Sequence, residues 1–256
     1  MRVLRRLALT ISYVTSFHFF KSASSEDELR GLSVYLPTVG IFIGALLFTV
    51  YWLLNLVDCA DLLRAFLLSG SWLIATGSIH LDGLMDAADG LFSHRDRDRM
   101  LEIMRDSRVG NFGAISGIML LAAKICALTL IPEKWMLPAL LLIPAWARWS
   151  EVFAIAFYPY ARAEGMGKIW HESTEKQDLL PALALPGLLT LAICIYFNSA
   201  AISFVIPLAI LPGILFASRI NCVLSGHTGD TYGAVVELSE ASAVILLALF
   251  SKFLQF

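Results

Sequence analysis

Charged side chains are scarce in this sequence, and their shortage excludes several classes of protein. Asp, Glu, Lys and Arg make up 16% of the 256 residues, whereas soluble domains carry about 25%. Hydrophobic residues make up 58%, which excludes a disordered chain and argues against a soluble globular protein. The formal net charge of −2 gives no general attraction to nucleic acid, so we expect no nucleic-acid partner. The composition indicates an integral membrane protein.

Several familiar site signatures are also missing. The four cysteines are scattered, with no C-x-x-C pair and no Cys/His cluster, which excludes a zinc site and a disulfide framework. No Ser-His-Asp order and no Gly-rich dinucleotide fingerprint occurs. The segment Gly165-Met-Gly-Lys168 lacks the full spacing of a P-loop and its following Ser or Thr. Any chemistry must therefore come from other polar residues between the apolar segments.

Long apolar segments recur along the chain at lengths that suit membrane-spanning helices, which need about 20 residues to cross the hydrocarbon. We predict an all-α polytopic fold with one membrane-embedded catalytic domain over residues 1–256. About seven spans are predicted, at residues 33–57, 65–81, 112–131, 135–155, 179–197, 199–217 and 242–256. Residues 3–20 are predicted to form an amphipathic interfacial helix, because Leu7, Ile11 and Val14 recur at helical spacing.

The distribution of basic residues sets the expected orientation. Fifteen of the 19 Lys and Arg residues fall in segments that this topology places on one side, namely residues 1–32, 82–111, 148–178 and 218–241. The positive-inside rule assigns that side to the cytoplasm. We therefore expect a cytoplasmic N-terminus and a cytoplasmic active site.

An acidic stripe follows the second predicted span. In His80-Leu-Asp-Gly-Leu-Met-Asp-Ala-Ala-Asp-Gly90, Asp82, Asp86 and Asp89 recur at i, i+4 and i+7, on one face of a helix. Carboxylates alone suit a hard cation such as Mg²⁺, which is usually shared with substrate phosphates. The alternative interpretation is a solvated helix whose carboxylates bind nearby arginines.

A basic segment comes next, Arg105-Asp106-Ser107-Arg108. Arg105 and Arg108 would lie at i and i+3 on a helix and could grip a phosphate, while Asp106 could add a carboxylate. An arginine pair that meets lipid phosphate at the interface is an equally good interpretation. Lys124 falls within a predicted span and is expected to pair with a carboxylate or a phosphate.

A second acidic segment lies near the C-terminal end. Asp230 and Glu237 are seven residues apart and nearly in register on a helix. Before them, His227 and Thr228 lie in a Gly-flanked turn that could meet an anion.

The third cytoplasmic segment supplies further charges. Arg162 and Lys168, around Gly165 and Gly167, could hold a large anionic substrate. Arg148 and Glu151 are expected to neutralise each other at depth.

Carboxylates and arginines on one membrane face suit metal-assisted phosphoryl transfer. Two alternatives remain at this point. One is a Mg-dependent membrane phosphotransferase that acts on a lipid alcohol. The other is a cation transporter, because intramembrane carboxylates also mark ion paths.

Three long motifs resemble the cobalamin synthase family, also named adenosylcobinamide-GDP ribazoletransferases. They are the His80–Gly90 segment, Asp98-Arg-Met-Leu-Glu-Ile-Met-Arg-Asp-Ser-Arg-Val-Gly110, and Gly226-His-Thr-Gly-Asp-Thr-Tyr-Gly-Ala-Val-Val-Glu-Leu-Ser-Glu240. The resemblance runs over nearly the whole chain. It implies that adenosylcobinamide-GDP and α-ribazole, or its 5′-phosphate, are joined in a Mg²⁺-dependent reaction that releases GMP. It also implies a bacterial cytoplasmic (inner) membrane location, and leaves a homo-oligomer open.

On this resemblance, site residues can be assigned as hypotheses. The predicted metal ligands are Asp82, Asp86, Asp89, Asp230 and Glu237. The predicted catalytic carboxylates are Asp82, Asp86, Asp89 and Asp106. The predicted substrate and phosphate contacts are Arg105, Arg108, Lys124, Arg162, Lys168, His227 and Thr228.

Overall fold

The computed structural model describes residues 2–18 and 26–251, and it confirms an all-α membrane protein. Within these residues the chain forms twelve α-helices and two short 3₁₀ helices, with no β-strand. In chain order they are α1 (Arg2–Val14), α2 (Glu26–Leu29), η1 (Ser33–Tyr35), α3 (Leu36–Leu56), α4 (Asp61–Thr76), α5 (Ile79–Leu91), α6 (Arg97–Ile103), α7 (Asn111–Leu128), α8 (Glu133–Phe157), α9 (Met166–Glu172), η2 (Lys176–Asp178), α10 (Leu179–Tyr196), α11 (Ala201–Leu224) and α12 (Gly229–Phe250).

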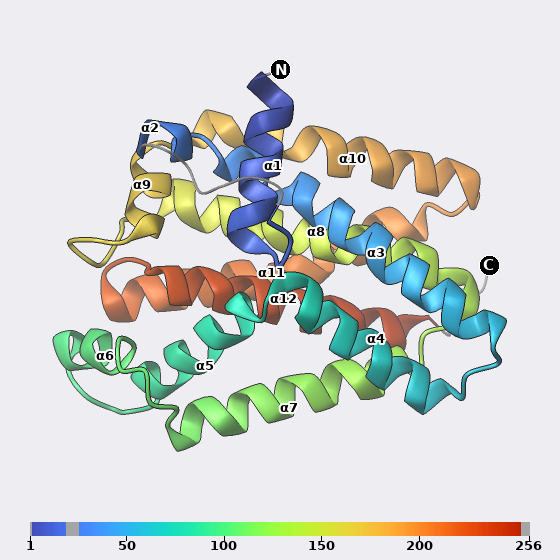
Figure 1. Cartoon of the computed structure of the whole chain (residues 1–256), viewed down its shortest axis with the longest axis horizontal. Coiled ribbons are helices and arrows are strands. Elements are labelled where there is room, and N and C mark those ends of the chain that lie inside the picture. Colours follow the sequence, from blue (N-terminus) through green and yellow to red (C-terminus); the bar gives the residue numbers. More distant parts are fainter. Residues whose placement is uncertain (1, 19–25, 252–256) are drawn as a thin grey trace.

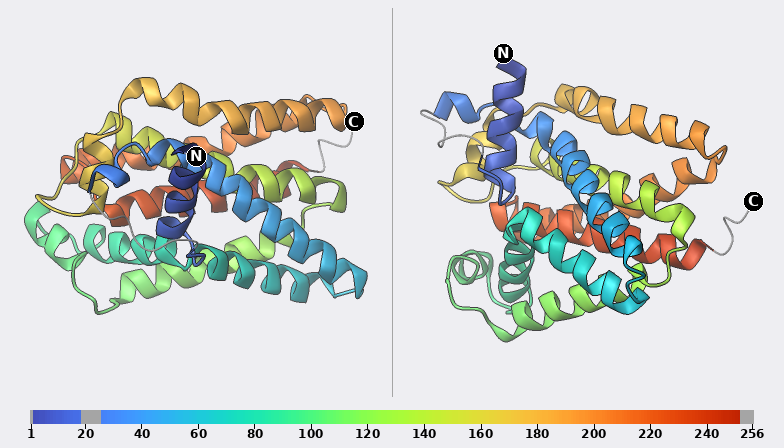
Figure 2. Two further views of the ribbon diagram at one scale, coloured as in Figure 1. Left: turned by 45° about the horizontal axis from the view of Figure 1, so that its top comes forward. Right: turned by 45° about the vertical axis from the view of Figure 1, so that its right-hand side comes forward.

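Helices α3, α7, α8, α10, α11 and α12 run roughly along the long axis of the molecule (Figure 1; Figure 2). In its most apolar stretch α8 is 72% buried and α12 is 67% buried, whereas α7 is 33% and α10 is 22% buried. Helices α8 and α12 therefore form the centre of the bundle. The others surround them and turn apolar faces outward, as expected where lipid replaces water.

Glycines bring α3 and α8 into close contact. A Cβ atom on Gly40 would lie 2.4 Å from the carbonyl oxygen of Pro144, and one on Gly44 would lie 2.3 Å from that of Leu140. Glycines four residues apart let two membrane helices approach closely, since lipid provides no hydrophobic drive for their association. This contact anchors α8, which carries buried charges toward the polar end.

Five helical segments are long and apolar enough to cross a membrane, and the bent pair α4–α5 makes a sixth. A helix is present at each of the seven predicted positions, but α11 is counted only as a shorter apolar helix over Ile210–Leu224. Among the described residues the count is therefore five or six, and the 24-residue helix α11, at the predicted 199–217 position, enters it only through Ile210–Leu224.

Two predicted span boundaries differ from the structure. The 65–81 segment is broken by a 90° bend, because Gly77 (φ 61°) and Ser78 (φ 58°) both adopt the left-handed conformation that ends α4. The last helix, α12, begins at Gly229 and not at residue 242. Its early acidic residues are tolerated because buried cations neutralise them, as shown below. Residues 252–256 of the predicted last span lie outside the described residues.

The N-terminal helix α1 crosses the direction of the long helices (Figure 1; Figure 2). Leu9, Ile11 and Val14 are buried against the bundle, while Val3 and Leu4 are exposed. This is the arrangement expected of an amphipathic helix that lies along a membrane surface. The predicted range of 3–20 is too long, because the helix ends at Val14 and residues 15–18 are not helical; residues 19 and 20 lie outside the described residues.

Candidate active site

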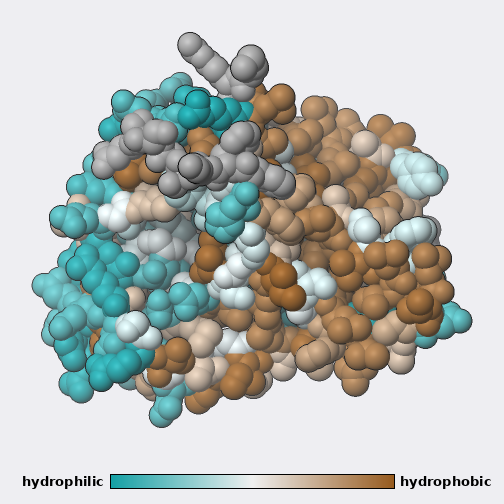
Figure 3. Space-filling view, in the orientation of Figure 1, coloured by the Kyte–Doolittle hydropathy of each residue, from teal (hydrophilic) through white to brown (hydrophobic). Residues whose placement is uncertain are grey.

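Polar side chains gather at one end of the molecule. Figure 3 shows hydrophilic residues over the end that carries α2, α5, α6 and α9, and mainly hydrophobic residues toward the other end. The three segments singled out by the sequence motifs, around α5, α6 and the start of α12, all reach this polar end (Figure 1). Chemistry that needs water-soluble substrates is expected at this end.

The acidic face of α5 meets the start of α12. Asp82 is exposed and Asp86 is half-buried. Asp86 interacts electrostatically with Asp82 and with Asp230, the first acidic residue of α12. The contact is close because Gly83 has no side chain. A Cβ there would lie 2.7 Å from the carbonyl oxygen of Asp230. Carboxylates from two distant segments are therefore brought together.

An arginine reaches this acidic group from the loop after α8. The Arg162 guanidinium Nη2 lies 2.6 Å from Asp230 Oδ2, and the side chains are only 12% and 23% exposed. Arg97 holds the same loop, since its Nη2 donates to the carbonyl of Ala161 at 3.1 Å. Burial raises the pKa of the nearby Tyr160, so its phenol stays protonated at neutral pH.

His227 and Thr228 have structural roles, and their side chains are bonded to neighbouring groups of the protein, which for Thr228 include the Asp230 carboxylate at 3.3 Å. The His227 side chain is fully buried, with Nδ1 3.1 Å from Thr231 Oγ1 and Nε2 3.1 Å from the carbonyl of Ala217. Burial lowers the pKa of His227 to about 4, which keeps the ring neutral. Thr228 is also fully buried and caps α12 by accepting from the Thr231 amide. The predicted phosphate contacts at these two residues are therefore not supported.

The main chain of His227 positions the arginine loop. Its amide donates to the carbonyl of Pro159 at 2.8 Å, and its carbonyl accepts from the amide of Ala161 at 2.7 Å. These two bonds tie residues 159–161 to the turn before α12. This backbone pairing holds Arg162 beside Asp230.

The Arg105–Arg108 segment is a loop and not a helix, because α6 ends at Ile103. Arg108 is 87% exposed and pairs with Asp106, with 2.6 Å between Nη2 and Oδ2. Hydrogen bonds from Arg108 lower the pKa of Asp106 to about 2. Asp106 is thus the partner of an arginine. Arg105 instead lines a cavity of about 270 Å³ together with Arg97 and Arg162, and this cavity is a candidate phosphate site.

Asp89 caps α7. Its Oδ2 accepts from the amide of Gly110 at 2.7 Å, and its Oδ1 accepts from the amide of Gly113 at 2.8 Å. A carboxylate at a helix N-terminus satisfies free amides and complements the helix dipole. Both carboxylate oxygens of Asp89 therefore accept hydrogen bonds. Asp89 links α5 to the start of α7 and is not a free metal ligand.

Lys124 and Glu237 lie in a separate buried network. Lys124 Nζ is 2.6 Å from Glu237 Oε2 and 2.8 Å from Glu240 Oε2, and all three side chains are at most 5% exposed. Arg148 Nη1 lies 3.0 Å from Glu240 Oε1. Lys124 therefore has the carboxylate partner that was one of its two predicted options, and Glu237 is not available as a metal ligand. Arg148 is paired with Glu240 and not with the predicted Glu151.

Lys168 contacts its own loop. Its Nζ donates to the carbonyl of Ala163 at 2.7 Å and lies 3.9 Å from Glu172. It does not line the arginine cavity or the cavity beside Asp82. The predicted substrate contact at Lys168 is not supported by this arrangement.

The donor set on α5 and α12 suits a hard divalent cation. Asp82, Asp86 and Asp230 offer only carboxylate oxygens, which Mg²⁺ prefers. In the described part of the chain, no three His, Cys, Asp or Glu side chains form a preformed metal cage. Mg²⁺ sites with substrate phosphates commonly use one or two carboxylates and no complete protein cage. The residues present therefore fit a cation shared with a diphosphate.

Sequence reasoning missed three polar residues beside the acidic group. Glu151 of α8, Trp170 of α9 and Tyr232 of α12 line a cavity of about 250 Å³ that also includes Asp82 and Asp230. The sequence predicts Glu151 as the partner of Arg148. Its position three residues after a buried arginine gave no signal that it faces a cavity.

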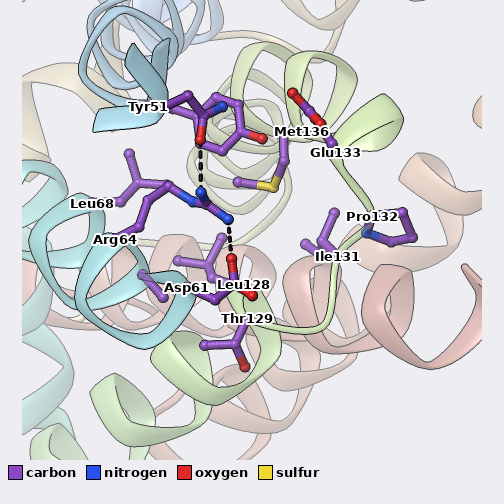
Figure 4. Close-up of a pocket in the computed structure, with 12 residues that line it drawn as sticks. Tyr51, Asp61, Arg64, Leu68, Leu128, Thr129, Ile131, Pro132, Glu133 and Met136 are labelled. Carbon is purple, nitrogen blue, oxygen red and sulfur yellow. Dashed lines mark hydrogen bonds and ion pairs between the residues drawn. The ribbon is translucent and has the colours of Figure 1, made fainter. Parts of the chain in front are cut away.

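A further cavity lies at the opposite, apolar end of the molecule. It has a volume of about 320 Å³ and is bordered by Tyr51, Asp61, Arg64 and Glu133 (Figure 4). The Arg64 guanidinium donates to Asn55 Oδ1 at 2.7 Å and also pairs with Asp61. This cavity shares no residue with the polar-end cavities, and its cation already has partners.

Comparison with known proteins gives one consistent result. The model of the family described as "Cobalamin-5-phosphate synthase" matches residues 6–249. An "Adenosylcobinamide-GDP ribazoletransferase" of Trichormus variabilis is 39% identical over 226 residues, which cover 87% of this chain and 88% of the relative. Proteins of the same name from Thermoanaerobacter pseudethanolicus and a Synechococcus species are 35% and 41% identical. The matches cover 96% and 84% of this chain, and 97% and 85% of those relatives. No solved structure matches the chain. The chain therefore belongs to the cobalamin-5-phosphate synthase family.

Proposed function

We propose that this protein is an adenosylcobinamide-GDP ribazoletransferase. It joins adenosylcobinamide-GDP to α-ribazole, or to α-ribazole 5′-phosphate, and releases GMP. The curated relatives that bear this name align with most of the chain. The single structural observation that carries the proposal is the Arg162–Asp230 ion pair, which links the acidic face of α5 to a cavity lined by arginines.

The reaction requires one phosphorus–oxygen bond to form and one to break. A ribose hydroxyl oxygen of the nucleoside attacks the phosphorus attached to cobinamide. The bond from that phosphorus to the bridging oxygen breaks, and GMP leaves with this oxygen. The hydroxyl proton passes to a carboxylate. Arg105 and Arg162, on one side of the acidic group, are placed to bind the diphosphate oxygens.

We assign Asp82, Asp86 and Asp230 as the residues that would hold Mg²⁺. When bound, the ion would neutralise the diphosphate and stabilise the departing GMP. This set differs from the sequence prediction because Asp89 caps α7 and Glu237 binds Lys124. Asp106, paired with Arg108, serves in this proposal to shape the 104–110 loop.

We also propose that the polar end faces the cytoplasm of a bacterial membrane. The positive-inside rule supports this orientation, because the segments rich in Lys and Arg lead to the polar end. Adenosylcobinamide-GDP and the nucleoside would then reach the site from the cytoplasm.

The two alternatives are not favoured. A transporter requires a polar path through the bundle, but Lys124, Arg148, Glu237 and Glu240, which are buried within it, are tied to one another by ion pairs. A lipid phosphotransferase receives no support from the relatives, which share one name.

The experiment is a product assay with the purified full-length protein in lipid nanodiscs. Adenosylcobinamide-GDP, α-ribazole and Mg²⁺ are supplied, and GMP and the cobalamin product are measured by mass spectrometry. We expect both products in equal amounts from the wild type, and a loss of about 100-fold or more in Asp82→Ala. Asp61→Ala, an exposed carboxylate at the opposite end, is the matched control and should retain activity. A folded wild-type protein without product would refute the proposal.

A further inference from the structure

The cavity of about 250 Å³ beside Asp82 and Asp230 contains polar groups that the proposed phosphate chemistry does not use. It is enclosed by residues of α1, α5, α8, α9 and α12. Val14, Ile79 and Met166 supply apolar wall, while Asp82 and Asp230 connect it to the acidic group. A group bound in this cavity would lie directly next to the proposed diphosphate.

Three of its lining side chains are buried, and each has a polar atom without a hydrogen-bond partner among the described residues. Glu151 is 4% exposed, Tyr232 is 2% exposed and Trp170 is 5% exposed. Among the described residues, no hydrogen-bond partner exists for Glu151 Oε2, Tyr232 Oη or Trp170 Nε1. Buried polar atoms in folded proteins are almost always paired. Three unpaired atoms from three helices around one cavity indicate that a ligand supplies the missing bonds.

The chemistry of the three atoms narrows the ligand class. Glu151 offers a hydrogen-bond acceptor, Trp170 offers a donor, and the Tyr232 hydroxyl offers both. Hydroxyl groups, which donate and accept, satisfy such a set. The indole ring of Trp170 and the apolar wall suit a flat or cyclic organic group, whereas the Tyr232 ring already stacks on His227 and contributes its hydroxyl. A polyhydroxyl ring with an aromatic base matches both features.

The charges around the cavity argue against a phosphate as its occupant. Asp82, Glu151 and Asp230 line it, whereas the neighbouring cavity has three arginines, Arg97, Arg105 and Arg162, against two carboxylates, Asp98 and Glu102. The Arg162–Asp230 ion pair lies where the two cavities meet. An anionic group is therefore favoured on the arginine side and a neutral group on the Glu151 side.

We propose that the Glu151 cavity is the binding site for the nucleoside acceptor, with Glu151 and Tyr232 hydrogen-bonded to its ribose hydroxyls and Trp170 against its ring system. This inference rests on the proposed function and adds to it the location and the recognition residues of the second substrate. Glu151 and Tyr232 hold the sugar so that one hydroxyl points toward the Asp82–Asp230 edge. The diphosphate occupies the other side of that edge.

The test uses the full-length enzyme in nanodiscs, with α-ribazole and adenosylcobinamide-GDP varied in turn. Glu151→Gln keeps the shape of the side chain and replaces one carboxyl oxygen with an amide nitrogen, and Tyr232→Phe removes one oxygen. We expect each to raise KM for α-ribazole about fivefold, the loss typical of one weakened or deleted hydrogen bond. KM for adenosylcobinamide-GDP should change less than about twofold. Glu133→Gln, an exposed carboxylate at the other end of α8, is the control.

The outcomes separate this inference from the proposed function. Wild-type turnover with unchanged α-ribazole KM in both variants would overturn the nucleoside site and leave the function standing. A parallel rise in both KM values would indicate a structural role and would also overturn it. Absence of wild-type turnover would overturn the function and this inference together. If Glu151→Gln fails to elute as a folded protein, Tyr232→Phe decides the result.

Discussion

Arg162 and Asp230 lie 2.6 Å apart at the boundary between two cavities of opposite charge. Arg162 lines the cavity that contains Arg97 and Arg105, whereas Asp230 lines the cavity that contains Glu151 and Asp82. The pair is held by the backbone bonds between His227 and the 159–161 loop. It places a cation and a carboxylate at the point where a phosphoryl group would have to pass between two substrates.

The first prediction concerns Arg162 itself. Arg162→Ala should lower kcat/KM by about 100-fold, because it removes a preorganised cation from developing phosphate charge. Arg162→Lys should lower kcat/KM less than Arg162→Ala does, since lysine keeps the positive charge but not the bidentate geometry. The matched control is Arg64→Ala at the opposite end. An Arg162→Ala enzyme with activity within twofold of wild type would contradict the account.

Gly83 provides a test of the close contact between α5 and α12. Gly83→Ala would place a methyl group 2.7 Å from the Asp230 carbonyl oxygen and must push the two helices apart. We expect a loss of about 1–3 kcal/mol in stability and a marked fall in turnover. Gly70→Ala is the control, because a Cβ at Gly70 has nothing within 4 Å. Equal thermal stability and turnover in both variants would show that the contact is not needed.

Asp89 should behave as a helix cap. Asp89→Ala removes the acceptor for the Gly110 and Gly113 amides and should lower the free energy of unfolding by about 1–2 kcal/mol. Asp89→Asn keeps one acceptor oxygen and should retain more turnover than Asp82→Asn does. Product assays and thermal melts of the three variants check this order. If Asp89→Asn were as inactive as Asp82→Asn while fully stable, Asp89 would be a metal ligand after all.

Lys124 is predicted to affect stability strongly. Lys124→Met leaves Glu237 and Glu240 buried without their cation, which typically costs about 3–5 kcal/mol. Lys124→Met/Glu237→Gln should recover part of this loss, because one uncompensated charge disappears. Thermal melts in detergent measure both, with the exposed Lys134→Met as control. A Lys124→Met protein as stable as wild type would show that the network contributes no stability.

Because the His227 ring is buried and neutral, we expect the free energy of unfolding to depend on pH. Its folded pKa of about 4 lies below the ordinary value of 6.5, so the unfolded chain binds a proton that the folded chain does not over this interval. Stability should therefore fall as pH drops from about 6.5 to about 4, by about 3 kcal/mol in total. His227→Gln should lack this component while it retains the other pH effects. Identical pH profiles of stability for the two proteins would refute the buried neutral ring.

The sequence was sufficient where local spacing determines the geometry. The i, i+4, i+7 pattern of Asp82, Asp86 and Asp89 lies on helix α5 as predicted. The same pattern could not reveal that Asp89 turns to the start of α7, because a cap depends on how two helices meet. Likewise, Arg105 and Arg108 fit helical spacing, but α6 ends before them.

Ion-pair partners that lie far apart in the chain could not be identified from the sequence. Lys124 was expected to find a carboxylate or phosphate, yet nothing local selects Glu237 and Glu240, which are 113 and 116 residues away. Glu151 was assigned to Arg148 because the two are near neighbours on α8. In the packed helices Arg148 forms an ion pair with Glu240, and Glu151 lines a cavity.

The most direct test of the central claim is a Mg²⁺ titration of turnover with adenosylcobinamide-GDP and α-ribazole, in the wild type, Asp82→Asn and Asp230→Asn. The account predicts that activity requires Mg²⁺ and that both substitutions, on different helices, raise the Mg²⁺ concentration for half-maximal turnover or abolish turnover. Activity that persists without divalent cations, or that is unaffected by Asp230→Asn, would contradict a site shared by α5 and α12.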